Sequence, residues 1–411
     1  MNFAFTEEEE KFREEIREVC LREKYGETAE GLPESGKSLG SFTPEFYRKV
    51  IDKGWAGLTL PREYGGQARS KIEETILADE MAFLEAPFPL PALYMVTTFL
   101  AKIILKRGSE QLKRRLLPRI ARGELWMGQG FTENDAGSDL SRTGTRAVRQ
   151  GDHYVLNGEK LYQSWAHGGE ALAEFGINQS VLLLLRTDQN APPEKSLSLI
   201  VLEANSPLPG MTVRPIMTVG GIPTNEVFFD DVKIPAEGLV GEENHAWDYI
   251  VESGAFYWEK RLGYILGTYR LLLQRLIKYV KETQVDGQPL SKNVLVRQKM
   301  ARMASGVEKF HLYTYRVAWA YDKGLDVDEA SSIYKFQKDQ IVRDFVDLTM
   351  EILGSYGQLK TGAKGAPLEG IMEAFYNIEL IHTFSSCGPN AMTNVIAGSA
   401  LGLPNEFGLI Y

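Results

Sequence analysis

Residues 128–169 contain the densest group of side chains that could contact a bound small molecule. A short β-like run ends at Thr132 and is followed by a polar turn. Such a turn exposes backbone N–H groups and hydroxyls, which suit a flat heteroaromatic ring with carbonyl edges, or a phosphate. Further along, Tyr162, Ser164 and Trp165 add aromatic faces and a hydroxyl. The residues alone fit either a ligand site or an ordinary polar β-hairpin corner, so both interpretations stay open.

The hydrophobic periodicity that must position these side chains changes twice along the chain. Helical spacing dominates residues 1–126 and 243–411, whereas residues 127–242 alternate with a period of two. We predict a mostly α protein of the α+β class, with an N-terminal helical domain, a central antiparallel β-barrel or sandwich domain and a C-terminal four-helix bundle. The predicted strands are 153–157, 180–186, 196–204, 211–216 and 225–232. The predicted long helices are 262–280, 296–323, 331–356 and 368–385, and Thr6 with Glu9 predicts a capping box that starts the first helix.

The composition excludes several classes of protein. The chain of 411 residues has 46 Lys+Arg and 55 Asp+Glu, a net charge of -9, which argues against a general nucleic-acid binder. Cys20 and Cys387 predict no disulfide framework, and the five histidines form no metal-binding pattern. The chain has no apolar run of about 18 residues and no secretory signal pattern. We therefore expect a cytoplasmic protein without a membrane span or a bound metal.

Two nucleotide-binding motifs lack the context that they need. Residues 31–38, GLPESGKS, match the P-loop pattern, but polar sequence precedes them and a second loop follows. A phosphate cradle requires a buried strand before it and a helix after it. No Gly-x-Gly-x-x-Gly follows a predicted strand either, so a nicotinamide site is not expected.

Several motifs resemble those of the acyl-CoA dehydrogenase family. Residues 131–139, FTENDAGSD, are similar to its signature [FLY]-[ST]-E-x-x-A-G-S-D. Gly158-Glu-Lys160 with Ser164 resembles its second signature, G-x-K-x-[WY]-x-[ST]. Further similar runs lie in the family's order at 55–66, 108–124, 225–232, 239–242, 296–300, 353–357 and 394–404. The resemblance therefore covers nearly the whole chain.

This resemblance implies FAD as the cofactor. Thr132 would donate to the pyrimidine edge of the flavin near N1 and O2, and Ser164 would reach the O4–N5 side. Tyr162, where the family often has Trp, would cover one face of the ring. Phe131 and Ser138 belong to the same signature and are expected in the cofactor site, and Ser138 would also contact the pantetheine or pyrophosphate of acyl-CoA. Hydride arrival at N5 places negative charge on N1–O2, which donors there stabilise.

The implied reaction is α,β-dehydrogenation of an acyl-CoA thioester, in which a carboxylate removes the α-proton as a β-hydride passes to the flavin. The usual C-terminal Glu is absent, because the corresponding segment 385–390 reads SSCGPN, and Cys387 is not expected to act as the base. A second family solution places the base early in the bundle, where Glu259 follows three aromatic residues that would raise its pKa. A surface Glu paired with Lys260 or Arg261 is the alternative role.

Two further departures concern the bundle. Thr283 replaces the family's Arg that reaches the FAD pyrophosphate, and residues 388–394, GPNAMTN, replace another FAD-holding run. We therefore expect an acyl-CoA dehydrogenase for an unusual, bulky or cyclic acyl group, with an electron-transferring flavoprotein or similar acceptor. The alternatives are a relative with modified thioester chemistry and a non-catalytic partner subunit. The family resemblance implies a homotetramer or a heterotetramer.

Overall fold

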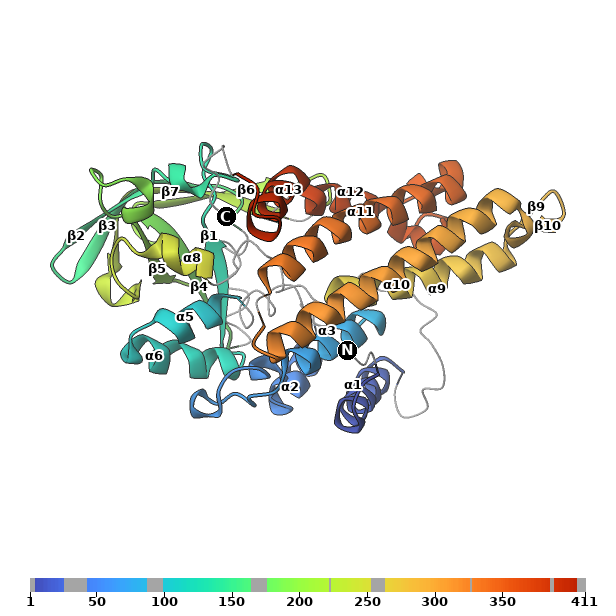
Figure 1. Cartoon of the computed structure of the whole chain (residues 1–411), viewed down its shortest axis with the longest axis horizontal. Helices are drawn as coiled ribbons and strands as arrows, with labels where there is room; N and C mark the ends of the chain where they lie inside the picture. Colours follow the sequence, from blue (N-terminus) through green and yellow to red (C-terminus); the bar gives the residue numbers. More distant parts are fainter. Residues whose placement is uncertain are drawn as a thin grey trace.

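Helices, a central sheet and a second set of helices follow one another along the chain, as predicted (Figure 1). The computed structural model describes residues 4–25, 43–86, 99–163, 176–221, 223–252, 263–325, 327–384 and 388–404. The sheet lies at one end of the molecule and long helices extend toward the other end, while the N-terminal helices lie along the lower side (Figure 1). The mostly α, α+β fold class is therefore confirmed.

The N-terminal helices begin with the predicted capping box. Thr6 N–H donates to Glu9 Oε2 at 2.7 Å, and Glu9 N–H donates to Thr6 Oγ1 at 3.2 Å, which satisfies two backbone donors of the first turn. The helices described in this part are α1 (Glu7–Tyr25), α2 (Pro44–Asp52), α3 (Lys71–Phe83), α5 (Ala101–Arg107) and α6 (Glu110–Ala121).

The central sheet is mainly antiparallel. Its strands are β1 (Leu125–Gly130), β2 (Arg146–Gln150), β3 (His153–Lys160), β4 (Asn178–Arg186), β5 (Leu197–Glu203), β6 (Met211–Met217), β7 (Pro223–Pro235) and β8 (Leu239–Val240). They are ordered β6-β7-β3-β2-β4-β5-β8, with β1 paired to β4. The antiparallel prediction differs from the structure in two places, because β1 and one residue pair of β2 run parallel to β4. Along the chain β3 lies between β2 and β4, and because β3 runs antiparallel to β2, β4 can run in the same direction as β2.

The C-terminal part is a bundle of long helices that lie beside one another (Figure 1). They are α9 (Tyr264–Glu282), α10 (Val294–Asp322), α11 (Asp328–Leu353) and α12 (Ile371–Phe384), followed by the short α13 (Pro389–Val395). The short helix α8 (Ala246–Glu252) precedes them, and a hairpin of β9 (Gln284–Val285) and β10 (Gln288–Pro289) joins α9 to α10. Their amphipathic spacing explains the arrangement, since each apolar stripe is buried against a neighbouring helix.

Helix α3 joins the N-terminal part to the bundle by a very close approach to α9. A Cβ atom on Gly263 would lie 2.3 Å from the carbonyl oxygen of Thr75, and one on Gly267 would lie 2.1 Å from that of Asp79. Only glycine permits these contacts at both positions. At the start of α3, Asp322 from the end of α10 accepts the N–H of Lys71 at 2.7 Å, which fixes a third helix to the same joint.

A buried network of charged groups lies within this joint. Arg270 Nη1 donates to Asp79 Oδ1 at 2.6 Å, and Tyr315 OH donates to Asp79 Oδ2 at 3.1 Å. Glu80 pairs with Arg13 at 2.8 Å and with Arg17 at 2.6 Å, which both lie on α1. Burial raises the pKa of Asp79 to about 6, although the Arg270 charge opposes the shift.

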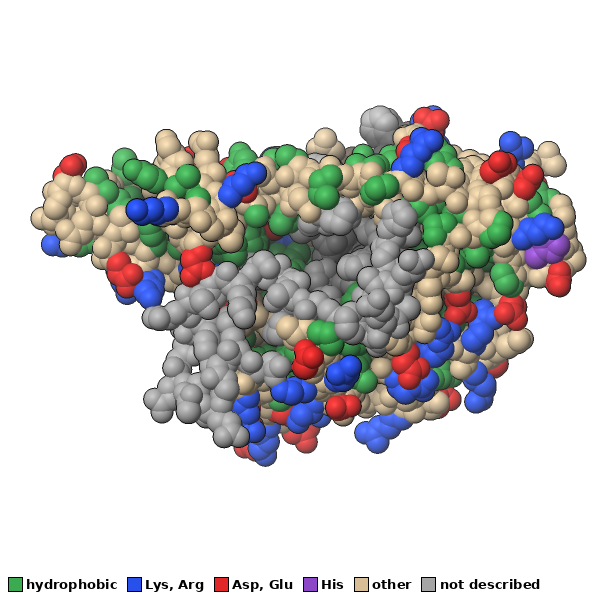
Figure 2. All heavy atoms as spheres, turned by 180° about the vertical axis from the view of Figure 1, so that it is seen from behind, with side chains coloured by type: hydrophobic (Ala, Val, Ile, Leu, Met, Phe, Trp, Pro, Cys, Tyr) green, Lys and Arg blue, Asp and Glu red, His purple; other side chains and the backbone are tan. Residues whose placement is uncertain are grey.

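The surface carries charges of both signs. Figure 2 shows the face opposite to that of Figure 1, where basic and acidic side chains are interspersed over the lower part and hydrophobic side chains gather along the upper edge. Within the described ranges, no helix is long and apolar enough to cross a membrane. No group of three or more His, Cys, Asp or Glu residues that could hold a metal ion occurs in the same ranges.

Removing the Arg270 charge tests the joint. Arg270→Met should lower the free energy of unfolding by roughly 3–5 kcal/mol near neutral pH, because it leaves the buried Asp79 carboxylate unpaired. A folded-state pKa above the unfolded value means that the folded protein binds this proton more tightly, so acid relieves the unpaired charge. Because the Arg270 charge lowers this pKa, the pKa of Asp79 in the variant lies above the wild-type value of about 6, so the deficit should shrink as pH falls toward 6 and be smallest below it. Urea denaturation at about pH 7.5 and at about pH 5 measures both values.

The double variant Asp79→Asn/Arg270→Met is the control. It has no ionisable group at position 79, so its deficit relative to Asp79→Asn should not change with pH in this way. An Arg270→Met deficit that is equal at both pH values would contradict the assignment.

Candidate functional site

The loop from residue 131 to 145 leaves the end of β1 and returns as β2, and it contains the first predicted signature. Phe131 is buried and packs edge-on against Phe99, with ring centroids 6.5 Å apart. Thr132 is half-buried, and its carbonyl oxygen accepts the N–H of Leu161 at 2.8 Å. The end of β3 therefore lies directly beside Thr132 and brings the two predicted signatures together.

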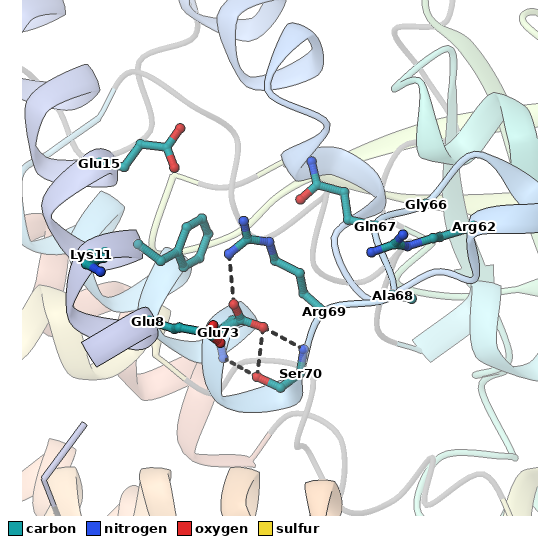
Figure 3. A pocket seen from close by; sticks show the side chains of 11 residues that line it. Glu8, Lys11, Glu15, Arg62, Gly66, Gln67, Ala68, Arg69, Ser70 and Glu73 are labelled. Atoms are coloured by element: carbon teal, nitrogen blue, oxygen red, sulfur yellow. Dashed lines mark hydrogen bonds and ion pairs between the residues drawn. The ribbon is translucent and has the colours of Figure 1, made fainter. Parts of the chain in front are cut away.

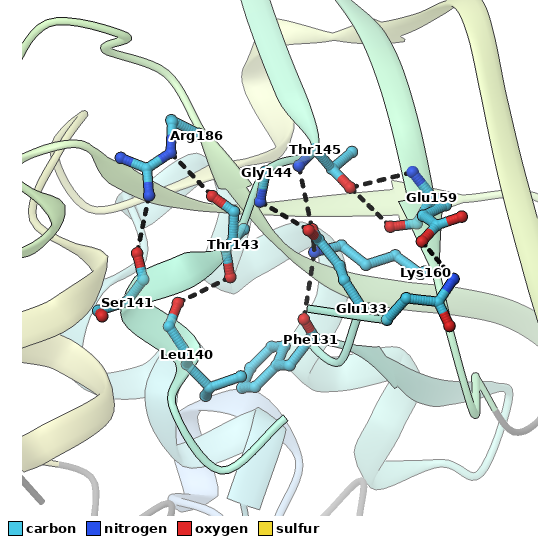
Figure 4. Close-up of polar contacts among 11 residues, drawn as sticks. Phe131, Glu133, Leu140, Ser141, Thr143, Gly144, Thr145, Glu159, Lys160 and Arg186 are labelled. Carbon is cyan, nitrogen blue, oxygen red and sulfur yellow. Dashed lines mark hydrogen bonds and ion pairs between the residues drawn. The ribbon is translucent and has the colours of Figure 1, made fainter. Parts of the chain in front are cut away.

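A buried ion pair fixes the start of this loop (Figure 4). Lys160 Nζ lies 2.6 Å from Glu133 Oε1 and 3.2 Å from the carbonyl oxygen of Phe131, and the Lys160 side chain has no exposed surface. Glu133 also accepts the N–H of Gly144 at 2.6 Å and that of Thr145 at 3.1 Å. One carboxylate thus ties both ends of the loop to the last residue of β3.

The pKa values of the pair keep both groups charged near neutral pH. Burial opposes the ionisation of Glu133, but Lys160 and the hydrogen bonds from Thr145 and Gly144 outweigh it and lower the pKa of this carboxyl. Burial lowers the pKa of Lys160 to about 8, a shift that the Glu133 charge limits.

Arg186 at the end of β4 holds the second half of the loop (Figure 4). Its Nη2 donates to the carbonyl of Ser141 and its Nε to the carbonyl of Thr143, both at 2.8 Å. Its Nη1 donates to Ser196 Oγ at 2.6 Å. A planar guanidinium can satisfy these three acceptors at once, which a lysine ammonium cannot do with the same geometry.

Tyr162 follows β3 in a strained backbone conformation. Its φ is +55°, and the residue is 61% exposed. The residues on both sides are held: Leu161 N–H bonds to Thr132, and Gln163 N–H donates to the carbonyl of Asn225 at 2.9 Å. Asn225 Nδ2 donates back to the carbonyl of Gln163 at 2.8 Å. A strained, exposed aromatic residue between fixed neighbours is typical of a ligand site.

Three domain families match the chain in order. They are "Acyl-CoA dehydrogenase, N-terminal domain" over residues 6–124, "Acyl-CoA dehydrogenase, middle domain" over 128–232 and "Acyl-CoA dehydrogenase, C-terminal domain" over 256–397. The chain belongs to the acyl-CoA dehydrogenase family. It is therefore an oxidoreductase of this family, and the sequence resemblance is confirmed.

Relatives match over almost the full length. The acyl-CoA dehydrogenase FadE26 of Mycobacterium tuberculosis is 29% identical, with 98% of this chain and 99% of FadE26 covered. The solved structure of the Tcur3481–Tcur3483 steroid ACAD has 26% identity and a TM-score of 0.83, covering 99% of this chain and 100% of that one. The ChsE4–ChsE5 complex of M. tuberculosis has 27% identity and a TM-score of 0.80, covering 98% and 100%.

The structure brings some of the predicted site residues of this acyl-CoA dehydrogenase together. Phe131, Thr132 and Tyr162 lie at the junction of the loop and β3, whereas Ser138 is exposed on the turn of the loop. The predicted Ser164 and Glu259 lie outside the described residues, as do Cys387 and the P-loop-like segment 31–38.

Thr283 and segment 388–394 occupy different ends of the bundle. Thr283 ends α9 beside the β9–β10 hairpin, at the end of the bundle remote from the β domain (Figure 1). Segment 388–394 forms most of α13, which packs on α11 at the other end.

Sequence reasoning assigned no role to Lys160, although it lies in the second signature, and it missed Arg186 and Asn225. The available signal was chemical: a Lys at an inward position of a β-strand needs a buried anion, and Glu133 is the acidic residue of the other signature. Arg186 ends a run of apolar residues and gave no comparable signal.

A separate surface pocket of about 810 Å³ lies between α1 and the segment before α3 (Figure 3). Its charged groups partly neutralise one another, since Arg69 Nη1 lies 2.8 Å from Glu73 Oε1. The Arg69 guanidinium also stacks on Phe12, with its Cζ 4.4 Å from the ring centroid. None of the predicted site residues lines it. We therefore do not assign it to the reaction.

The second signature requires Gly158 for a steric reason that can be tested. Gly158 has a φ of +139°, and a Cβ there would lie 2.7 Å from Thr145 Cα. Gly158→Ala should cost roughly 1–3 kcal/mol of backbone strain and should also separate Thr145 Oγ1 from the Glu159 carbonyl, now 2.6 Å apart. Denaturant unfolding measures the loss.

Gly151→Ala is the matched control. Gly151 has a φ of +67° in the β2–β3 turn, with no atom within 4 Å of the added Cβ. It should cost only about 1 kcal/mol. Equal losses in the two variants would contradict the steric account.

Proposed function

We propose that the protein catalyses FAD-dependent α,β-dehydrogenation of an acyl-CoA thioester. The observation that carries this proposal is the junction of the two signatures. There the Leu161 N–H donates to the Thr132 carbonyl oxygen at 2.8 Å, which places Thr132 beside the residue that precedes Tyr162. Membership of the acyl-CoA dehydrogenase family supports the same reaction.

The residues at this junction fit a flavin. In the described part of the chain, the half-buried Thr132 hydroxyl forms no hydrogen bond, so a donor remains available for a carbonyl-edged ring. Tyr162 offers an exposed aromatic face next to it. Because the backbone on both sides is already fixed, a ligand would find these groups in place at little cost in entropy.

When bound, FAD would supply the hydride acceptor for the reaction. Thr132 would donate to the N1–O2 edge, where negative charge collects, and Ser164 would donate at the O4–N5 side. Tyr162 would cover one face of the ring, and Phe131 would support the loop from the protein interior. Ser138, exposed on the turn, would contact the pantetheine or pyrophosphate of acyl-CoA.

Glu259 is the proposed base for the α-proton. Three aromatic residues, Phe256, Tyr257 and Trp258, precede it in the sequence, and such neighbours favour the neutral carboxyl and raise its basicity. No carboxylate occurs in the segment 385–390 that corresponds to the usual position. A surface Glu paired with Lys260 or Arg261 remains the alternative role.

The proposed substrate carries a bulky or cyclic acyl group. The displaced base motivates this choice, and the similarity to a structure titled steroid ACAD supports it. We propose an electron-transferring flavoprotein or a similar protein as the electron acceptor.

A second candidate function is that of one subunit of a heterotetramer, in which the flavin site and the catalytic base are divided unequally between two different kinds of subunit. The changed bundle positions Thr283 and 388–394 favour it, and the similar ChsE4–ChsE5 structure is a complex of two proteins. A homotetramer is the alternative assembly. The mass of the purified protein in solution, compared with the chain mass of 46.1 kDa, distinguishes a monomer from either assembly.

The Thr132 hydroxyl tests the cofactor assignment. The purified protein should be yellow, and Thr132→Val, alone or with Ser164→Ala, should weaken FAD binding or slow flavin reduction. The loss of a charge-assisted donor should cost roughly 1.5–3 kcal/mol. Fluorescence titration and stopped-flow absorbance measure the two effects. Thr212→Val, on the exposed side of β6, is the control. A colourless wild-type protein that cannot be reconstituted with FAD would defeat the proposal.

Replacing the proposed base isolates proton transfer. Glu259→Gln should retain the fold and the binding of FAD and acyl-CoA, but flavin reduction should slow by roughly two to four orders of magnitude. Cys387→Ala should have a mild effect, and Glu308→Gln on the exposed side of α10 is a control for carboxylate loss. Flavin bleaching at the wild-type rate in the Glu259→Gln variant would show that the base lies elsewhere.

A further inference from the structure

We propose that Lys160 is a positioning residue that sets the cofactor contact of Thr132 through the Phe131 carbonyl and the Glu133 carboxylate. This inference rests on the proposed function, because it concerns the same FAD site. Lys160 does not itself belong to the group of residues that would touch the cofactor, since its side chain is completely buried.

Three consecutive residues of the loop are tied to the end of β3. The Phe131 carbonyl accepts from Lys160 Nζ at 3.2 Å, the Thr132 carbonyl accepts from Leu161 N–H at 2.8 Å, and Glu133 Oε1 lies 2.6 Å from Lys160 Nζ. Thr132 is the central residue of the three. Its backbone orientation therefore depends on Lys160 on both sides. Its hydroxyl forms no hydrogen bond within the part of the chain that the structure describes.

The pair also sets the electrostatic field behind Thr132. Donation from a buried ammonium to the Phe131 carbonyl polarises the peptide between Phe131 and Thr132, which makes the Thr132 N–H a stronger donor. Glu133 balances the ammonium charge at short range. Removing the cation should therefore disfavour negative charge on the bound flavin, and removing the anion should favour it.

A purely structural role for Lys160 predicts a different pattern. Removing one partner of any buried Lys–carboxylate pair is costly, because it leaves an uncompensated buried charge. The pair Lys71–Glu74 on α3 offers a matched comparison, because its N···O distance is also 2.6 Å and both side chains are buried. It belongs to the N-terminal helices and not to the β domain.

The first test compares Lys160→Met with Lys71→Met in the full-length protein, using urea unfolding for stability and quenching of flavin fluorescence for FAD affinity. Both variants should lose stability. Only Lys160→Met should lose FAD affinity, by roughly 10- to 100-fold, by analogy with the loss seen when a residue that orients a metal ligand is removed. Lys160→Arg should recover most of the affinity, because it keeps the charge and the donors.

The second test measures the flavin reduction potential. It should fall in Lys160→Met and rise in Glu133→Gln relative to the wild type, whereas simple loosening of the loop would not produce opposite signs. If Lys160→Met does not fold, Glu133→Gln and Lys160→Arg decide the question in the same assays, and a Glu133→Gln protein with wild-type affinity and potential overturns the inference.

Two results separate this inference from the function on which it rests. A wild-type protein that binds no FAD overturns the proposed function and the role of Lys160 together. A folded Lys160→Met protein with the affinity and potential of the wild type overturns the role of Lys160 alone and leaves the function intact.

Discussion

The buried ion pair between Glu133 and Lys160 is the interaction on which the geometry of the candidate site depends. Removing two charges from water costs several kcal/mol for each ion, so the pair persists only because further hydrogen bonds complete it. Glu133 receives those bonds from the backbone of Gly144 and Thr145, and Lys160 gives its other bond to Phe131. Each of the two family signatures contributes one residue to this contact, Glu133 from the first and Lys160 from the second.

A second constraint concerns how the bundle meets the rest of the chain. Gly263, just before α9, and Gly267 within it let the backbone lie against α3, and Asp79 and Arg270 form an ion pair of 2.6 Å across the same contact. Helix α9 begins at Tyr264, shortly after the proposed base Glu259 in the sequence.

The order and type of the elements could be predicted because the hydrophobic period changes clearly from helical to alternating and back. The Thr6–Glu9 capping box was also predictable, since it depends on residues three positions apart. The parallel pairing of β1 with β4 could not be predicted, because period-two alternation does not encode strand direction. The family motifs predicted Thr132 and Tyr162 as cofactor residues, and this stays a prediction. The inward position of Lys160 indicated a buried anionic partner, whereas the contacts of Arg186 with the loop join distant residues and leave no local pattern.

Anaerobic mixing of the FAD-loaded protein with a panel of acyl-CoA thioesters tests the central claim most directly. The panel should include straight-chain, branched and cyclic acyl groups, and the flavin absorbance is followed as each is added. The account predicts that the flavin is bleached, and most rapidly by a bulky or cyclic acyl-CoA, with the α,β-unsaturated thioester as the product. A flavin that stays oxidised with every thioester, although the thioesters bind, would contradict the assignment of dehydrogenase activity to this chain.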